Sequence, residues 1–266
     1  MSGDELFVFI ASLAVLIPAW AGWYWQTATV AVHVGPAQWR PLLRIVPLAC
    51  AAVLWIVLRE LASFDVREDA QYLLMYMALG LAWVGACTRA TALAGISMRD
   101  DVLERRNRAA AIAIGGAMLG LTFAFAGGNI GDGPGWWVVV FAAGVATVAL
   151  FLLWLALDAL TGIADAITID RDRASGLRLA GFLVAAGLIL GRASAGDWVS
   201  AGATLMDFVR VGWPALPLLA TAVLGERAMR PTPERPSPPV LSKGTVPALL
   251  YVAVAIGYLA VVGLGR

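Results

Sequence analysis

The chain has few of the residues on which most catalytic and metal sites depend. Its 266 residues include one histidine and two cysteines, and only 14% of them are charged. The single imidazole, His33, lacks the further ligands that a zinc centre needs, because Cys50 and Cys87 lie in separate apolar segments. We therefore expect no metal site, no disulfide framework and no catalytic triad. The two cysteines are expected to be small apolar packing residues.

Motifs for nucleotide cofactors and features of nucleic-acid binding are lacking as well. The chain has no GxxxxGK[ST] phosphate loop, and no GxGxxG motif follows a strand. Its formal net charge is +1, and its charges do not form the extended basic surface that nucleic acid requires. We predict that the protein has no cofactor, no nucleic-acid partner and no enzymatic activity.

Apolar sequence is what the chain has in abundance. Hydrophobic residues make up 61% of it and its mean hydropathy is +0.81, whereas soluble proteins are about 45–50% apolar. Runs of about 20 apolar residues predict helices that span a membrane. Eight such runs are present, at residues 6–25, 42–61, 72–94, 109–127, 136–157, 174–190, 211–224 and 246–264. The predicted fold class is therefore an all-α, polytopic membrane bundle of about eight helices.

The seventh run differs from the other seven. It covers residues 211–224 only, and it contains Pro214 and Pro217. Proline removes a backbone hydrogen bond and kinks or breaks a helix. This segment therefore predicts either a kinked span or a re-entrant segment.

The distribution of basic residues predicts the orientation in the membrane. Most of the 19 basic residues lie in or beside the odd-numbered loops, whereas the loop at 128–135 has none. The positive-inside rule then places the odd-numbered loops in the cytoplasm and both termini on the periplasmic or extracellular side of a bacterial inner membrane. The acidic start, with Asp4 and Glu5, lacks the basic region of a cleavable signal peptide, so we expect the first span to be retained.

One stretch occurs twice, 65 residues apart. Residues 104–116 align without gaps on residues 169–181. In each copy a charged segment ends in Asn107 or Asp172, and an apolar helix-forming run follows. Asparagine and aspartate are preferred N-cap residues, because their side-chain oxygen accepts from amides that open a helix. The two residues are therefore predicted to be helix caps.

The returning helix of each copy has small residues in register. Gly116 and Gly120 in the first copy correspond to Gly181 and Ala185 in the second. Small residues four apart let two membrane helices approach closely. We predict that these four residues are helix-packing positions.

This repetition predicts four helical hairpins that all insert in the same direction, because each unit holds an even number of spans. The tandem parallel repeat comprises residues 67–132 and 133–200. An N-terminal hairpin at 1–66 precedes it, and a C-terminal hairpin at 201–266 follows. The last unit includes a proline-rich cytoplasmic linker, 229–244, which we interpret either as a stiff spacer or as a docking segment for a partner.

Two groups of polar residues are candidate sites. Asp158 and Arg178 lie near the cytoplasmic ends of consecutive spans, and an intramembrane ionisable pair is either a structural contact or part of an ion or proton pathway. Arg192, Asp197 and Trp198 lie at the predicted periplasmic face. They either close and anchor a helix or present a polar site.

These segments resemble a known family. Residues 170–181, together with 187–198, are similar to the signature half of the YjfL-like bacterial inner-membrane family, domain of unknown function 350, and residues 99–111 resemble its first half. The resemblance covers about 72–198. It implies a multi-span inner-membrane protein without an established activity.

Two functional hypotheses follow. The first is a non-enzymatic protein with a structural, envelope-stress or partner-scaffolding role. Its partners would be the lipid bilayer, further copies of the chain, or an unidentified membrane or cytoplasmic protein. The second is a channel or transporter for a small ion or solute, which the tandem repeat and the pair Asp158 and Arg178 favour.

Overall fold

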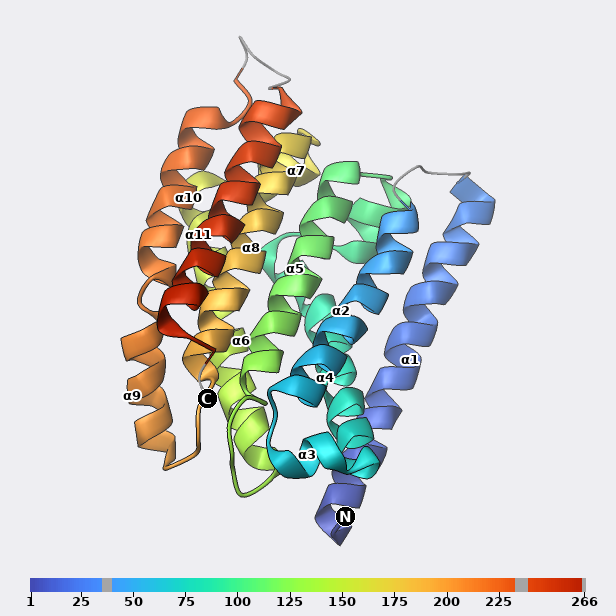
Figure 1. Cartoon of the computed structure of the whole chain (residues 1–266). Coiled ribbons are helices and arrows are strands. Elements are labelled where there is room, and N and C mark those ends of the chain that lie inside the picture. Colours follow the sequence, from blue (N-terminus) through green and yellow to red (C-terminus); the bar gives the residue numbers. More distant parts are fainter. Residues whose placement is uncertain (35–39, 233–238, 265–266) are drawn as a thin grey trace.

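The protein forms an all-helical bundle in a computed structural model, which describes residues 1–34, 40–232 and 239–264 (Figure 1). The long helices are α1 (Gly3–Val34), α2 (Arg40–Glu60), α4 (Ala70–Ala90), α5 (Arg108–Gly127), α6 (Trp136–Thr161), α8 (Arg173–Ser194), α9 (Ala201–Gly212), α10 (Ala215–Met229) and α11 (Val246–Val262). The shorter ones are α3 (Phe64–Glu68), η1 (Thr91–Ala94), η2 (Met98–Glu104), α7 (Ile163–Thr168) and η3 (Leu241–Thr245).

Within these residues, seven helical segments are long and apolar enough to cross a membrane, and α9 with α10 forms a bent pair that also passes this test. The prediction of an all-helical membrane protein with about eight spans is confirmed to this extent. Helices dominate because a bilayer offers backbone amides and carbonyls no water, so each segment must satisfy them internally.

Two turns with the same local geometry lie at one end of the bundle. Arg106 and Arg171 both have positive φ, 53° and 56°, and each immediately precedes the N-cap of a long helix. The amide of Asn107 donates to the carbonyl of Asp101, and the amide of Asp172 donates to that of Ala166. We call this the arginine end, defined by turns 105–108 and 170–173.

The opposite end holds turns 128–135 and 195–200, and we call it the glycine end. The Gly131 and Gly196 backbones both have positive φ there and lie against each other. Both ends of the described chain are also here, since Trp136 Nε1 donates to Asp4 Oδ2 at 3.3 Å and Arg192 Nε donates to the carbonyl of Gly263 at 2.6 Å.

Helices α5 and α8 form the centre of the molecule and are the most buried of the candidate spans. They run in parallel, because both begin at the arginine end, where Gly176 packs on Ala109, and both end at the glycine end. A Cβ atom on Gly127 would lie 1.9 Å from the carbonyl oxygen of Gly191, so the two backbones are in direct contact.

The predicted packing positions lie in this region. A Cβ on Gly116 would lie 2.3 Å from Cα of Ala180, and one on Gly120 would lie 2.4 Å from the carbonyl oxygen of Leu183. Gly181 faces away from α5, toward α11, where its Cβ would lie 2.5 Å from Cα of Ala248. The fourth position, Ala185, is fully buried.

The other helices surround this pair. Helices α2 and α4 contact α5, α1 packs on α4, α6 contacts both α5 and α8, and α9, α10 and α11 contact α8. Helix α1 lies at one edge of the bundle, and α9 and α10 lie at the opposite edge (Figure 1). Helices α1 and α11 are the least buried of the seven single-helix spans.

The predicted seventh span, residues 211–224, straddles a break in the structure. Helix α9 ends at Gly212, Trp213 and Pro214 form the break, and α10 continues at an angle of 43°. Helix α9 begins beside the glycine end, and Arg230 near the end of α10 donates to the carbonyl of Thr161 at the arginine end. The pair therefore connects the two ends of the bundle, with helix boundaries wider than the prediction gave.

Candidate functional site

A group of charged residues is buried where α8, α10 and η3 meet near the arginine end. Arg178 on α8 is 2% exposed, and its Nε donates to Oε2 of Glu226 on α10 at 2.6 Å. Its Nη1 donates to the carbonyl of Lys243 in η3. Its Nη2 lies 3.8 Å from Oδ2 of Asp172. One guanidinium thus joins three segments of the chain.

Ser175 lies at the centre of this group. Arg178 Nη2 donates to Ser175 Oγ at 2.9 Å, and Oγ lies 2.8 Å from Oδ2 of Asp172 and 2.7 Å from Oε1 of Glu226. A hydroxyl carries a single hydrogen, so it donates to only one of these two oxygens at a time. We call Asp172, Ser175, Arg178 and Glu226 the buried ion network.

The local sequence explains how α8 contributes three of these residues. Asp172 caps the helix, and Ser175 and Arg178 follow at intervals of three, so the side chains occupy one face. Arg178 lies about 9 Å along the axis from the cap, at 1.5 Å per residue. Burying charges costs free energy, which pairing and hydrogen bonds offset. Here the guanidinium is paired with two carboxylates and donates three hydrogen bonds.

Asp158 is not a member of this network, although its place in the sequence predicts a pair with Arg178. Its Oδ1 accepts from the amide of Ala164 at 2.8 Å, and its carbonyl accepts from the amide of Gly162 at 2.6 Å. Asp158 therefore supports the turn between α6 and α7. The partner that Arg178 has instead, Glu226, lies just beyond the predicted span 211–224. The one sign of this partner in the sequence is a single glutamate two residues after the end of the apolar run.

The residues at 107 and 172 both open long helices. Asn107 Oδ1 accepts from the amides of Ala109 and Ala110 at 2.9 and 3.3 Å, and Asp172 accepts from the amides of Ala174 and Ser175. Asn107 Nδ2 also donates to the carbonyl of Ile167 at 2.6 Å. It therefore ties the start of α5 to α7, a contact that the sequence did not indicate.

The candidate motif at the glycine end divides into two parts. Asp197 Oδ1 accepts from the amide of Asp132 at 2.8 Å, so it links two turns 65 residues apart. Trp198 packs edge-on against Trp137, with ring centroids 5.0 Å apart. Arg192 does not join them, because its guanidinium binds the carbonyl of Gly263 at the end of α11.

A cavity of about 290 Å³ lies beside Asp197 at this end. It is lined by charged groups of both signs, including Arg67, Asp132 and Asp197. Ionisable side chains of both signs can bind a polar solute, so the cavity is a second candidate site. It is separate from the buried ion network, which lies at the other end of α8.

Within the described ranges, no three His, Cys, Asp or Glu side chains are placed to hold a metal ion. Cys50 is buried and Cys87 is partly buried, and both are free thiols. The structure does not describe the side chain of His33 or residues 233–238 in the predicted linker. The two interpretations of that linker, spacer or docking segment, therefore stay predictions.

Comparison with known proteins identifies the central part of the chain. The family model described as Domain of Unknown Function (DUF350) matches residues 56–194, just over half of the chain. The chain belongs to the DUF350 family. This confirms the resemblance. The match begins at residue 56, near the end of α2, whereas the resemblance was expected to begin at about residue 72. No curated protein and no solved structure matches the chain.

The limits of the DUF350 domain divide the buried ion network. Asp172, Ser175 and Arg178 lie within the domain, whereas Glu226 and Lys243 lie in the C-terminal helices beyond it. The domain supplies the arginine and the C-terminal segments supply its closest carboxylate and a carbonyl. The network therefore joins the DUF350 domain to the rest of the chain.

Proposed function

We propose that this DUF350 protein is a non-enzymatic membrane protein with a structural, envelope-stress or partner-scaffolding role. The observation that carries this proposal is the contact between α5 and α8. Their backbones approach so closely at Gly120, Gly127 and Gly187 that no side chain fits between them. A centre packed in this way is suited to rigidity, because it leaves no space for a solute between its two helices.

The proposed scaffold is built from a tandem parallel repeat. Three features support this, because each recurs at a spacing of 65 residues. They are the N-cap residue, the arginine with positive φ before it, and the hydrogen bond from the cap's amide to a carbonyl of the preceding element. Positive-φ glycines recur at the same spacing at the other end. Two similar hairpins that pack side by side would bury the small-residue faces of both returning helices.

The proposed location is the bacterial inner membrane, with the arginine end in the cytoplasm and both termini periplasmic. The exposed residues Arg105, Arg106, Arg108, Arg171 and Arg173 support this orientation, because positively charged loops remain in the cytoplasm. The glycine end carries the paired aromatic rings of Trp137 and Trp198, which suit the interface of the opposite leaflet.

Homo-oligomers and an unidentified protein partner are the proposed binding partners beside lipid. The exposed apolar faces of α9 and α11 support this, with Met206, Val209, Leu250 and Val254 all more than 55% exposed. Lipid alone can also cover such a face, so the partner must be found by experiment. Crosslinking in native membranes, followed by purification and mass spectrometry, should recover a stoichiometric partner or a dimer of this chain.

The alternative function is a channel or transporter for a small ion or solute. The buried ion network favours it, because ionisable groups within a span often mark an ion or proton pathway. Ser175 can direct its one hydrogen to either Asp172 or Glu226. That property is useful in proton transfer, but it serves equally to join α8 to α10.

Flux measurements distinguish the two functions. The full chain is reconstituted into liposomes that report proton, potassium or chloride movement, beside Glu226→Gln and the control Glu104→Gln, which changes an exposed carboxylate at the same end. For a scaffold we expect all three proteins to match protein-free liposomes. Flux that liposomes with the wild-type protein show, that Glu104→Gln retains and that Glu226→Gln loses would reject the scaffold and establish the alternative.

A further inference from the structure

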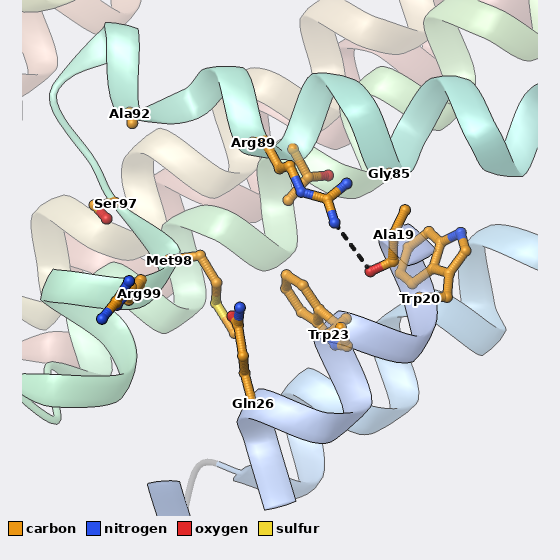
Figure 2. Close-up of a pocket in the computed structure, with 12 residues that line it drawn as sticks. Ala19, Trp20, Trp23, Gln26, Gly85, Arg89, Ala92, Ser97, Met98 and Arg99 are labelled. Atoms are coloured by element: carbon orange, nitrogen blue, oxygen red, sulfur yellow. Dashed lines mark hydrogen bonds between the residues drawn. The ribbon is translucent and has the colours of Figure 1, made fainter. Parts of the chain in front are cut away.

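A cavity of about 180 Å³ lies between α1, α4 and η2, close to the arginine end. Its wall is formed by Ala19, Trp20, Gly22, Trp23 and Gln26 from α1, by Gly85, Thr88 and Arg89 from α4, and by Ala92, Ser97, Met98 and Arg99 from the segment that follows. Figure 2 shows Arg89 and Arg99 on one side of this space and Trp20, Trp23 and Gln26 on the other. Helix α1 is an edge helix with little burial, so the cavity borders on the surroundings of the bundle.

The charge in the cavity is positive. Among its described lining residues there are two arginines and neither aspartate nor glutamate. Arg99 is paired with Glu104 at 3.1 Å on the exposed side. Among the described residues, Arg89 bonds to backbone at long distances, with Nη2 3.4 Å from the carbonyl oxygen of Pro18 and 3.5 Å from that of Ala19. Its guanidinium therefore retains donors for an anion.

The two carboxylates that directly follow Arg99 in the sequence are engaged elsewhere. Asp100 accepts from the hydroxyl of Ser97 at 2.9 Å, and Asp101 accepts from the amide of Ser97 and from Arg105. Neither side chain lines the cavity. An anion that entered would thus meet Arg89 without a competing carboxylate in the wall.

The two tryptophans give the cavity an apolar wall. Trp20 Nε1 donates to the carbonyl of Leu81 at 3.0 Å, and Trp23 Nε1 donates to that of Leu43 at 2.9 Å. Both indole donors are used within the protein, and the rings are held edge to face with centroids 6.1 Å apart. The rings therefore offer fixed apolar surface beside the arginine.

We propose that this cavity binds an anionic phospholipid, with the phosphate on Arg89 and the upper acyl region against Trp20 and Trp23. Arginine matches phosphate in charge and in the geometry of its donors. Basic pockets between membrane helices on the cytoplasmic side bind anionic head groups, and tryptophan suits the same depth. A free phosphate would use the arginine but not the apolar wall. The site rests on the proposed orientation of the arginine end, and it does not depend on whether the protein is a scaffold or a transporter.

Native mass spectrometry of the full chain in detergent tests this site. The probes are phosphatidylglycerol and phosphatidylcholine with identical acyl chains. Both lipids carry a phosphate, but the quaternary ammonium of phosphatidylcholine cancels its charge, so we expect roughly tenfold tighter binding of the net anionic phosphatidylglycerol. Arg89→Gln should remove this preference. Arg108→Gln, which removes an exposed arginine at the same end but outside the cavity, should retain it.

A second variant keeps the charge and fills the space. A Cβ on Gly22 would lie 3.8 Å from Arg89 Nη2 with no closer neighbour, so Gly22→Leu should fold and occupy the cavity. We expect it to weaken phosphatidylglycerol binding as Arg89→Gln does, and it decides the matter if Arg89→Gln does not fold. Unchanged preference in both cavity variants, or equal loss in Arg108→Gln, would overturn the proposal. Displacement of the lipid by inorganic phosphate at equal concentration would show a soluble-anion site instead.

Discussion

At the scale of single residues, Arg178 has the largest predicted effect on stability. Replacing it in Arg178→Met leaves the carboxylate of Glu226, which is 1% exposed, without its charged partner. Removing one member of a buried pair costs about 3–5 kcal/mol. We expect a marked loss of thermal stability in detergent, measured as the temperature at which the protein ceases to be monodisperse.

A double variant separates pairing from packing. Arg178→Met with Glu226→Leu removes both charges and should be more stable than Arg178→Met alone, because no unpaired carboxylate remains at position 226. Arg99→Gln, which breaks an exposed pair with Glu104, should change the transition little. A double variant less stable than the single one would contradict the assignment of the buried ion network.

Asn107 carries a second prediction at this scale. Asn107→Asp keeps a good N-cap oxygen but replaces the amide that donates to the carbonyl of Ile167. Asn107 is 1% exposed, so the new carboxylate would face that carbonyl without water. We expect a loss of at least about 1 kcal/mol in the same thermal assay. The exposed cap of α9 supplies the control, since Ser200→Asp exchanges two good caps and should be nearly neutral.

The sequence predicts those contacts that are local along the chain. Asn107 and Asp172 were recognised as helix caps because a cap bonds to amides two or three residues away. The partner of Arg178 was not recognised, because Glu226 lies 48 residues further along and only packing brings α8 and α10 together. Asp158, which is nearer in the sequence, points instead into the turn that it closes.

At the scale of helices, the α5–α8 contact makes the sharpest prediction. A Cβ on Gly120 would lie 2.4 Å from the carbonyl oxygen of Leu183, and one on Gly187 would lie 2.3 Å from that of Gly120. Gly120→Ala and Gly187→Ala should therefore force the helices apart, at a cost of about 1–3 kcal/mol or more. The thermal transition in detergent measures this loss.

Gly257 on α11 supplies a matched control for these variants. It also lies in a helix, but no atom lies within 4 Å of its Cβ position. Gly257→Ala should therefore be neutral or stabilising by up to about 1 kcal/mol, since alanine loses less backbone entropy. Equal effects at positions 120 and 257 would show that helix propensity, rather than close packing, sets the stability.

Long helices could be predicted from the sequence and short ones could not. Runs of about 20 apolar residues have no alternative to a helix in a bilayer, so the seven predicted runs end within a few residues of the observed apolar segments. Helix α1 itself continues beyond its run, to Val34. The short elements α3, η2 and α7 carry charges and bury one side only, so hydropathy does not reveal them. Pro214 and Pro217 predict a disruption of the seventh run, and the break between α9 and α10 falls at Trp213 and Pro214.

At the scale of the whole molecule, the C-terminal helices complete what the DUF350 domain begins. The domain ends at residue 194, yet its central arginine is held by Glu226 and by the carbonyl of Lys243. Helix α11 also covers Gly181 of the same helix. The chain therefore folds as one bundle around α8. This helix is buried on all sides because the segments beyond the domain cover the face that the domain leaves open.

The orientation of this bundle can be tested with single cysteines. In a background with Cys50→Ala and Cys87→Ala, the exposed positions Arg173→Cys and Val199→Cys mark the arginine end and the glycine end. We expect a membrane-impermeant maleimide to label position 199 in intact cells, and to label position 173 only after the membrane is opened, because positive loops stay in the cytoplasm. The background without cysteines controls for non-specific labelling.

A third position links orientation to the number of crossings. The two described ends of the chain both lie at the glycine end, where Asp4 meets Trp136 and Gly263 meets Arg192. Ser2→Cys should therefore label together with position 199, because an even number of crossings returns the chain to the side on which it began. If position 173 alone were labelled in intact cells, the orientation of the bundle would be the inverse of the one proposed. It would also move the arginine-lined cavity to the outer leaflet, where the attraction of anionic cytoplasmic lipids no longer acts on it.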